Sequence, residues 1–293
     1  MIAQSPPCEL LVVDNGSNDR TPVLLTELAA QNPDRLRWIR EPRPGLSTAR
    51  NTGIEQTHGE IVIFIDDDAI PDEGWLAALV AEFSDPGIWA AGGPVRPIIS
   101  STFPDWFSAR FLPYLSAWDR GSEAEDLSYN EYPRGTNIAF RRRVFADLGT
   151  FLPQLGRQGR SLRSCEETEL CLRIERSGRR IRYLPAARVV HKVDVGRLTK
   201  AWMTDRFFAQ GFSEALMEWR HAGFEGLRIG LRRSAFQLRQ ASGPSDPTSE
   251  LFRTCQTGAR RGYVAGSLYG ALRIPRYTSS RTDQMLATWL PPL

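Results

Sequence analysis

Three consecutive aspartates, Asp66, Asp67 and Asp68, directly follow the most apolar run of the sequence, Ile61–Ile65. The run predicts a buried strand, and ligands of open α/β sheets bind at the carboxyl ends of such strands. Adjacent carboxylates repel one another unless a positive charge relieves them, and hard oxygen ligands suit Mg²⁺ or Mn²⁺. The pattern therefore predicts a divalent-cation site, with a solvated acidic turn as the alternative.

Other residues suited to chemistry stand at the ends of predicted elements. Asp14 ends an apolar run and precedes a turn at 15–17. We expect its carboxylate either to accept a hydrogen bond from a nucleobase or ribose or only to stabilise the turn. Glu166 and Glu167 open a predicted helix at its positive end, which favours ionised carboxylates for catalysis or for capping. His191 lies in an apolar strand, where a histidine is either a core residue or a metal ligand.

Short apolar runs alternate with helical periodicity, which is typical of an α/β fold with a mainly parallel mixed sheet. From Leu198 onward the pattern is mainly helical, with a flexible break expected at 241–249, where Gly, Pro and Ser cluster. We therefore expect a catalytic part at 1–197 and a helical, basic part at 198–293. The predicted strands are 9–13, 35–40, 61–65, 89–92, 181–184 and 189–193, and the predicted helices are 21–32, 47–57, 73–83 and 167–177.

Composition excludes several classes of protein. The 293 residues contain 41% hydrophobic and 24% charged side chains, which is ordinary for a folded globular chain. Residues 1–133 carry 9 basic and 21 acidic side chains, and the remainder carries 28 basic and 13 acidic. This asymmetry predicts cation sites in the first part and an anionic partner for the second, with solvated charged faces as the alternative. We expect no membrane span, because no apolar stretch reaches about 20 residues, and no secretion signal, because the first ten residues lack a basic start followed by an apolar block. The four cysteines lack zinc or disulfide-framework spacing.

Several motifs follow one another along the chain. They are Val12–Asp19, Gly45–Ile54, Gly59-Glu60 ahead of Phe64–Asp68, Arg134–Arg141, Glu166–Arg173, and Tyr183–Ala186 followed by His191. In this order and spacing they resemble the family-2 glycosyltransferases. The resemblance covers roughly residues 3–195 and is only general beyond them.

The resemblance implies a GT-A fold that uses a nucleotide-diphosphate sugar and Mn²⁺ or Mg²⁺. Glu167 stands where the family has the Asp of its Glu-Asp pair, which serves as catalytic base, and Glu166 matches the Glu beside it. The longer Glu167 side chain keeps the carboxylate and extends its reach. Inverting transfer needs one base, which takes the proton of the acceptor hydroxyl. It needs no general acid, because the metal neutralises the charge on the departing diphosphate. The implied donor-binding residues are Asp14, Arg50, Asn51, Asp66, Asp67 and Asp68; the implied metal ligands are Asp66, Asp68 and His191; and the acceptor side comprises Gly135, Thr136 and Asn137.

Two further segments predict partners. Residues 97–133 are rich in aromatic side chains, including Trp106, and predict either a loop that stacks on a sugar acceptor or a satellite hydrophobic cluster. Apolar residues recur at helical spacing beside arginines between 227 and 239, which predicts docking on an anionic membrane surface or packing on the catalytic part. We expect a cytoplasmic protein, peripheral at the inner face of the cell membrane, with a glycan or lipid-linked acceptor. No nucleic-acid partner is expected, because no recognisable binding motif is present.

The family's pattern begins with an apolar strand and a helix that have no counterpart before Glu9. Because that strand is central in the family's sheet, we expect a sheet without it, low stability and weak activity, with the true start upstream or the chain an impaired copy. A catalytically impaired relative that acts in binding or regulation is therefore the alternative to a working enzyme. A nicotinamide dehydrogenase is disfavoured, because no GxGxxG follows the first strand.

Overall fold

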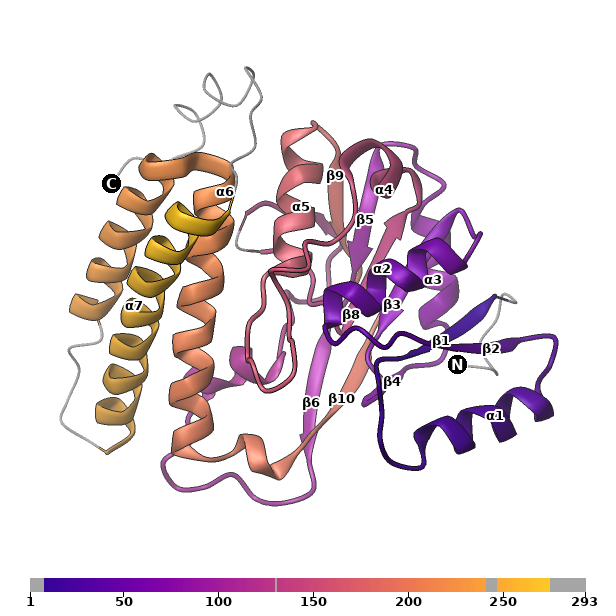
Figure 1. The fold of residues 1–293 in the computed structure, drawn as a ribbon, viewed down its shortest axis with the longest axis horizontal. Helices are drawn as coiled ribbons and strands as arrows, with labels where there is room; N and C mark the ends of the chain where they lie inside the picture. Colours follow the sequence, from indigo (N-terminus) through magenta and orange to yellow (C-terminus); the bar gives the residue numbers. More distant parts are fainter. Residues whose placement is uncertain (1–7, 130, 241–246, 275–293) are drawn as a thin grey trace. The chain divides into compact units, whose positions relative to one another are not determined.

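The computed structural model describes residues 8–129, 131–240 and 247–274, without the side chains of 229 and 233–240. These residues form two compact units (Figure 1). Segments 103–111 and 161–165 pack with the helical part of the chain, and the division expected at residue 197 stays a prediction. The first unit takes in the chain up to Thr102, Leu112–Arg160 and Glu166–Val195, and the second takes in Phe103–Phe111, Ser161–Cys165 and the chain from Gly196.

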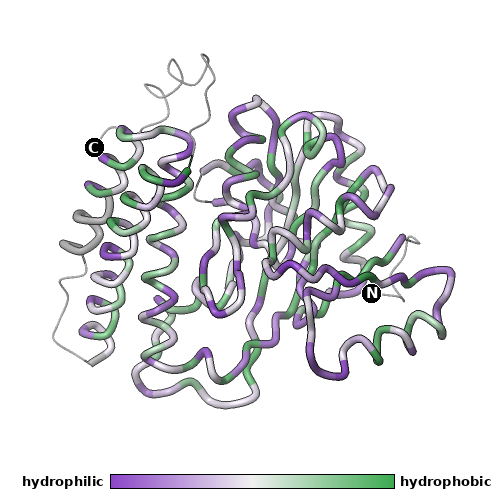
Figure 2. Tube along the Cα trace, viewed as in Figure 1, coloured by the Kyte–Doolittle hydropathy of each residue, from purple (hydrophilic) through white to green (hydrophobic). Residues whose placement is uncertain are grey.

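The first unit contains a mixed five-stranded sheet. Its order is β3 (Ile61–Ile65), β8 (Asn137–Arg141), β5 (Ile88–Gly92), β9 (Arg180–Tyr183) and β7 (Glu125–Asp126). Strand β8 runs antiparallel to β3 and β5, and β5 runs parallel to β9. The strands predicted at 61–65, 89–92 and 181–184 are confirmed, whereas β8 was not predicted. Strand β3 is hydrophobic along its length (Figure 2), but it lies at the edge of this sheet and Val62 is its one buried residue.

Two smaller sheets complete the first unit. Strand β1 (Leu10–Asp14) pairs in parallel with β2 (Leu36–Arg40), and β10 (Val189–Val193) lies between β4 (Ala69–Pro71) and β6 (Val95–Ile99). The predicted strands at 9–13, 35–40 and 189–193 are thus confirmed. Within the described residues β1 has β2 as its one ladder partner, so this pair forms a sheet of its own. The expectation of a missing central strand stays a prediction.

Helices of the first unit cover the sheets and form the core. The helices α1 (Thr21–Gln31), α2 (Leu46–Gln56), α3 (Trp75–Glu82) and α5 (Glu166–Arg176) lie where the sequence predicts them, and α4 (Arg143–Leu148) is additional. Trp75 and Leu79 of α3 are buried with Ile88, Ala91 and Ala139 of the sheet. This packing removes apolar surface from water and fixes the strand ends from which the polar residues project.

The second unit is a bundle of helices. Helix α6 (Lys200–Gln240) is interrupted at Gly223, whose φ of 55° lies in the region that favours glycine, and its two halves run in opposite directions (Figure 1). Helix α7 (Pro247–Arg273) packs along α6. The break expected through residue 249 therefore ends earlier, because Pro247 is well suited to the first helical position. Residues 241–246 lie outside the described residues.

Part of the apolar pattern at 227–239 packs within the helical bundle, and the membrane contact expected for it stays a prediction. Leu227 is buried with Trp219 and Tyr263, and Leu231 packs against the same cluster. These two leucines therefore face the core of the bundle, because the second half of α6 folds back on its neighbours. The side chains of Ala235 and Leu238, which continue the same apolar pattern, lie outside the described residues.

Part of the predicted aromatic loop is a packed cluster in the second unit. The Trp106 ring lies 5.7 Å from the rings of both Phe107 and Phe111. Phe111 is fully buried and packs edge-on against Phe207 and Phe252. For this part of the segment the alternative of a hydrophobic cluster holds, and stacking of Trp106 on an acceptor stays a prediction.

Candidate active site

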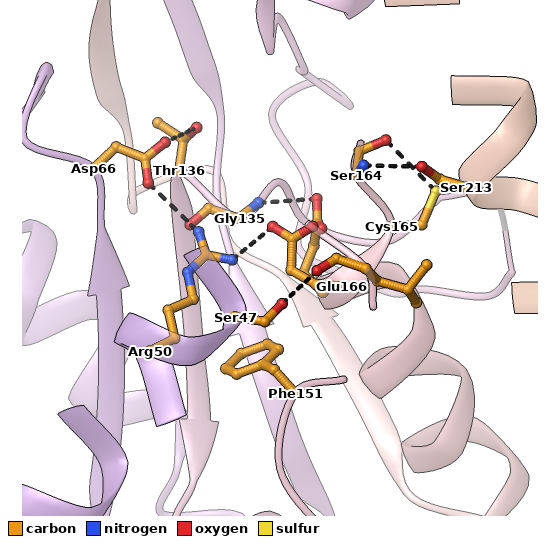
Figure 3. A network of polar contacts seen from close by, with 12 residues as sticks. Ser47, Arg50, Asp66, Gly135, Thr136, Phe151, Ser164, Cys165, Glu166 and Ser213 are labelled. Atoms are coloured by element: carbon orange, nitrogen blue, oxygen red, sulfur yellow. Dashed lines mark hydrogen bonds and ion pairs between the residues drawn. The ribbon is translucent and has the colours of Figure 1, made fainter. Parts of the chain in front are cut away.

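A buried arginine of α2 connects residues from three other parts of the first unit (Figure 3). Arg50 of α2 donates from Nη1 to Glu166 Oε1 at 2.9 Å and from Nη2 to the Gly135 carbonyl at 3.0 Å. Its Nη2 also lies 3.5 Å from Asp66 Oδ1. The guanidinium therefore brings together the end of β3, the turn before β8 and the first residue of α5.

Two aromatic rings hold the Arg50 guanidinium in place. Its central carbon lies 5.6 Å from the ring centroids of Phe64 and Phe151, a distance at which a cation is attracted to a ring face. Asn51 fixes Phe151, because its Nδ2 donates to the Phe151 carbonyl at 2.9 Å and its Oδ1 accepts from the Phe151 amide at 3.0 Å. The side-chain amide of Asn51, which was predicted to bind the donor, thus forms hydrogen bonds to the Phe151 backbone.

Glu166 is buried at the start of α5 beside a close-fitting loop. Burial, and then the neighbouring Glu167 charge, raise the pKa of Glu166 to about 7 against the opposing effect of Arg50. Gly156 has a φ of 82°, and a Cβ there would lie 3.2 Å from Glu166 Oε2 and 2.9 Å from Ser47 Oγ. The lack of a side chain at Gly156 therefore lets the loop cover the carboxyl group.

Glu167 is more exposed than Glu166 and is held by one oxygen. Its Oε1 accepts a hydrogen bond from the Gly135 amide at 3.3 Å. Its Oε2 is buried and has no hydrogen-bond partner within the described residues. Thr136 next to Gly135 donates from Oγ1 to Asp66 Oδ2 at 2.9 Å. The turn at Gly135 and Thr136 therefore binds one oxygen of Glu167 and one oxygen of Asp66.

Asp68 and His191 form the second polar pair. His191 Nε2 lies 3.2 Å from Asp68 Oδ1, and Nδ1 lies 3.2 Å from the Leu115 carbonyl. Because a carbonyl only accepts, Nδ1 donates, and Nε2 faces the carboxylate with either a proton or a lone pair. The two atoms face each other at a distance at which both residues could bind one cation. The oxygen and imidazole donors fit Mn²⁺ or Mg²⁺.

The third predicted ligand, Asp66, is directed elsewhere. Its carboxylate faces Arg50 and Thr136, while Asp67 is exposed in the turn after β3. Across the ranges that the structure describes, no three His, Cys, Asp or Glu side chains gather closely enough to hold a metal ion. A cation at Asp68 and His191 would therefore need further oxygen ligands from substrate or water.

Asp14 and Asn137 occupy supporting positions. Asp14, buried at the end of β1, accepts from the Ser17 amide at 3.0 Å and lies 3.8 Å from Arg40 Nε. Asn137 is fully buried, accepts from Trp75 Nε1 at 2.8 Å and donates to the carbonyl of Ala187 at 2.7 Å. Asn137 was expected to contact the acceptor, but its side chain has no surface exposed to solvent in this structure.

Comparison with known proteins identifies the family. The family model described as glycosyl transferase family 2 matches residues 1–149. Glucosyl-dolichyl phosphate glucuronosyltransferase of Haloferax volcanii is 32% identical over 215 residues, which cover 72% of this chain and 68% of that protein. Succinoglycan biosynthesis protein ExoM of Rhizobium meliloti is 28% identical over 204 residues, 69% of this chain and 62% of ExoM. The chain belongs to glycosyl transferase family 2.

Solved structures agree on the fold. The mannosyltransferase PcManGT from Pyrobaculum calidifontis, in complex with GDP-Man and Mn²⁺, gives a TM-score of 0.52 at 21% identity, covering 97% of this chain and 72% of that one. The structure of GalNAc-T7 with UDP, GalNAc and Mn²⁺ gives a TM-score of 0.53 at 18% identity. The match covers 99% of this chain and 54% of the GalNAc-T7 chain. The fold is therefore the GT-A fold of glycosyltransferases. None of the helices within the described residues is both long and apolar enough to cross a membrane.

Proposed function

We propose that this glycosyltransferase transfers a sugar from a nucleotide-diphosphate donor to a hydroxyl acceptor with inversion at the anomeric carbon. The observation that carries the proposal is the Glu167 carboxylate, which is oriented by the Gly135 amide through one oxygen and lacks a hydrogen-bond partner on the other among the described residues. In direct displacement, the acceptor oxygen forms the new bond as its proton passes to Glu167 and the bond to the diphosphate breaks.

The remaining polar residues would position the donor. Arg50 holds Asp66 and Glu166 in fixed places, and Thr136 binds the second Asp66 oxygen. Asp68 and His191 would hold Mn²⁺ or Mg²⁺, with Asp66 nearby. When bound, such a cation neutralises the charge that develops on the departing diphosphate, so no general acid is required. Asp14, buried at the end of β1, would contact the nucleobase or ribose.

The acceptor is proposed to be a hydroxyl of a glycan or a lipid-linked sugar. The name of the Haloferax relative specifies glucosyl-dolichyl phosphate, and the ExoM name specifies succinoglycan biosynthesis. Gly135 and Thr136 are the proposed acceptor-side residues, because both lie within hydrogen-bond reach of the carboxylates in the network.

A donor screen tests the proposal. The chain is incubated with UDP-, GDP- and other nucleotide sugars with and without Mn²⁺, and the released nucleoside diphosphate is measured. We expect release from one donor class, dependent on Mn²⁺ and absent in Glu167→Gln. A chain that binds a nucleotide sugar but never releases diphosphate would favour the impaired relative, and a chain that neither binds nor hydrolyses any donor would contradict the proposal.

A further inference from the structure

Helix α7 has two faces of opposite character. One face packs against α6 through glycines: a Cβ at Gly262 would lie 1.9 Å from the Phe208 carbonyl oxygen, and one at Gly266 would lie 2.4 Å from that of Phe212. The other face carries large apolar side chains on successive turns. Their exposed fractions are 43% for Val264, 63% for Leu268 and 80% for Leu272.

An exposed aromatic residue lies at the same end of the bundle. Phe224, which follows the reversal at Gly223, is 72% exposed, and its ring lies 5.0 Å from that of Trp219. Trp219 in turn donates from Nε1 to the Ile274 carbonyl, just beyond α7, at 2.9 Å. Phe224 therefore lies near the last turn of α7. We call Val264, Leu268 and Leu272 the apolar stripe.

Positive charge borders the apolar stripe. Arg260 and Arg261 are exposed one turn before Val264, and Arg273 is exposed beside Leu272. The whole of α7 contains four arginines and a single acidic residue, Glu250, at its opposite end. Glu225, which follows Phe224, is bonded to Arg228. The charge complementary to this border is therefore negative.

We propose that the apolar stripe and its arginines form a docking surface for an anionic lipid bilayer. A helix with exposed leucines between arginines inserts its apolar face at the boundary of head groups and acyl chains, while the guanidinium groups bind lipid phosphates. A second copy of the chain is a poorer occupant, because a two-fold contact would bring arginines of both copies together. Contiguous exposed apolar surface of this kind marks an interaction site.

Vesicle flotation of the full chain tests the assignment. Wild type and Leu268→Glu/Leu272→Glu are mixed with phosphatidylcholine vesicles or with vesicles that also contain phosphatidylglycerol. Leu24→Glu/Leu28→Glu is the matched control, because these α1 leucines are 48% and 44% exposed at the same spacing. We expect wild type and the control to float with anionic vesicles alone, and the stripe variant to bind at least about tenfold less.

Two further measurements keep the test decisive. Circular dichroism and thermal unfolding establish that the stripe variant is folded, and raising the salt concentration should weaken wild-type binding, because the arginines bind by charge. The proposal is overturned by equal binding to both vesicle types, by no binding to either, or by equal loss in the α1 control. A dimer in solution that the stripe substitutions dissociate would assign the surface to a second copy instead.

Discussion

The Arg50 guanidinium and the Glu166 carboxylate form a buried ion pair, with 2.9 Å between Nη1 and Oε1. Both side chains are nearly inaccessible to solvent, so neither charge is compensated by water if its partner is removed. The same guanidinium bonds the Gly135 carbonyl and approaches Asp66, so the pair is also the structural link between the carboxylates of the proposed active site.

Removing Arg50 should therefore be costly. Above the Glu166 pKa of about 7, Arg50→Met leaves the buried carboxylate without a partner, and we expect the free energy of unfolding to fall there by about 3–5 kcal/mol and turnover to fall with it. Arg143→Met is the control, because it breaks an exposed pair with Asp147 and should change stability by about 0.5 kcal/mol or less. Urea unfolding measures both.

A double-mutant cycle separates the ion pair from the packing of Arg50. In the Arg50→Met/Glu166→Gln protein the uncompensated charge is absent, so the double variant should be less destabilised than the sum of the single variants. Additive losses, or equal losses in the Arg50 and Arg143 variants, would show that the pair is not coupled as its geometry implies.

The raised pKa of Glu166 predicts that folding stability depends on pH. The pKa rises from 4.5 to about 7 on folding, so the folded chain holds the proton more tightly between these values. This contribution to stability is fully present below about pH 4.5 and is lost as the pH rises through about 7. Each unit of pKa difference corresponds to about 1.4 kcal/mol.

Unfolding measured across this pH range tests the prediction. Glu166→Gln should flatten the decline in stability, because an amide does not titrate there, while Glu73→Gln, at an exposed position, should keep the wild-type slope. Identical slopes in the wild type and Glu166→Gln would assign the pH dependence to other groups.

The sequence could predict the elements that carry a local signal. The strands at Leu10–Asp14 and Val189–Val193 and the helix from Glu166 follow from apolar runs, turns and capping residues. Strand β8 was missed because its apolar centre, Ile138–Phe140, is short, and its burial depends on partners in β3 and β5 that lie far away in the chain. The reversal at Gly223 was missed because a glycine within a helical pattern does not by itself indicate a turn.

For the site, the sequence could predict positions but not contacts. Asp66 and Glu166 are recognisable because they stand at the ends of elements, yet nothing local indicates that Arg50 joins them. Phe151 had no signal, because it meets Asn51 across 100 residues of chain. The Leu115 carbonyl, which orients His191, was missed for the same reason, since backbone groups leave no mark in a sequence.

Glu167→Gln should abolish transfer while leaving donor binding intact. The amide keeps the shape of the carboxylate but cannot take the acceptor proton, so we expect turnover to fall by about 10²–10⁴-fold. Glu166→Gln should have a milder effect, because Glu166 is proposed to position rather than to react. Steady-state turnover and nucleotide-sugar titrations measure the two effects separately. If Glu166→Gln is the more severe change, Glu166, with its pKa of about 7, is the base.

Asp68→Asn and His191→Ala should each weaken Mn²⁺ binding, by about 10–100-fold if both residues hold the cation. Calorimetric titration with Mn²⁺ and a nucleoside diphosphate provides a readout independent of turnover, and chelation by EDTA should suppress donor use in the wild type. His58→Ala is the matched histidine control. Unchanged Mn²⁺ affinity in both site variants would mean that the Asp68–His191 contact holds a proton rather than a metal.

The glycines of α7 allow a matched pair of substitutions in the helical unit. Alanine stabilises a helix by about 1 kcal/mol relative to glycine, so Gly258→Ala, whose Cβ would come no closer than 3.5 Å to Thr204, should be neutral or stabilising. Gly262→Ala places its Cβ 1.9 Å from the Phe208 carbonyl oxygen, and the backbones of α6 and α7 must separate to admit it. We expect this overpacking to cost about 1–3 kcal/mol or more. Thermal unfolding of the two variants measures the difference, and equal midpoints would show that α7 does not pack against α6 through this face.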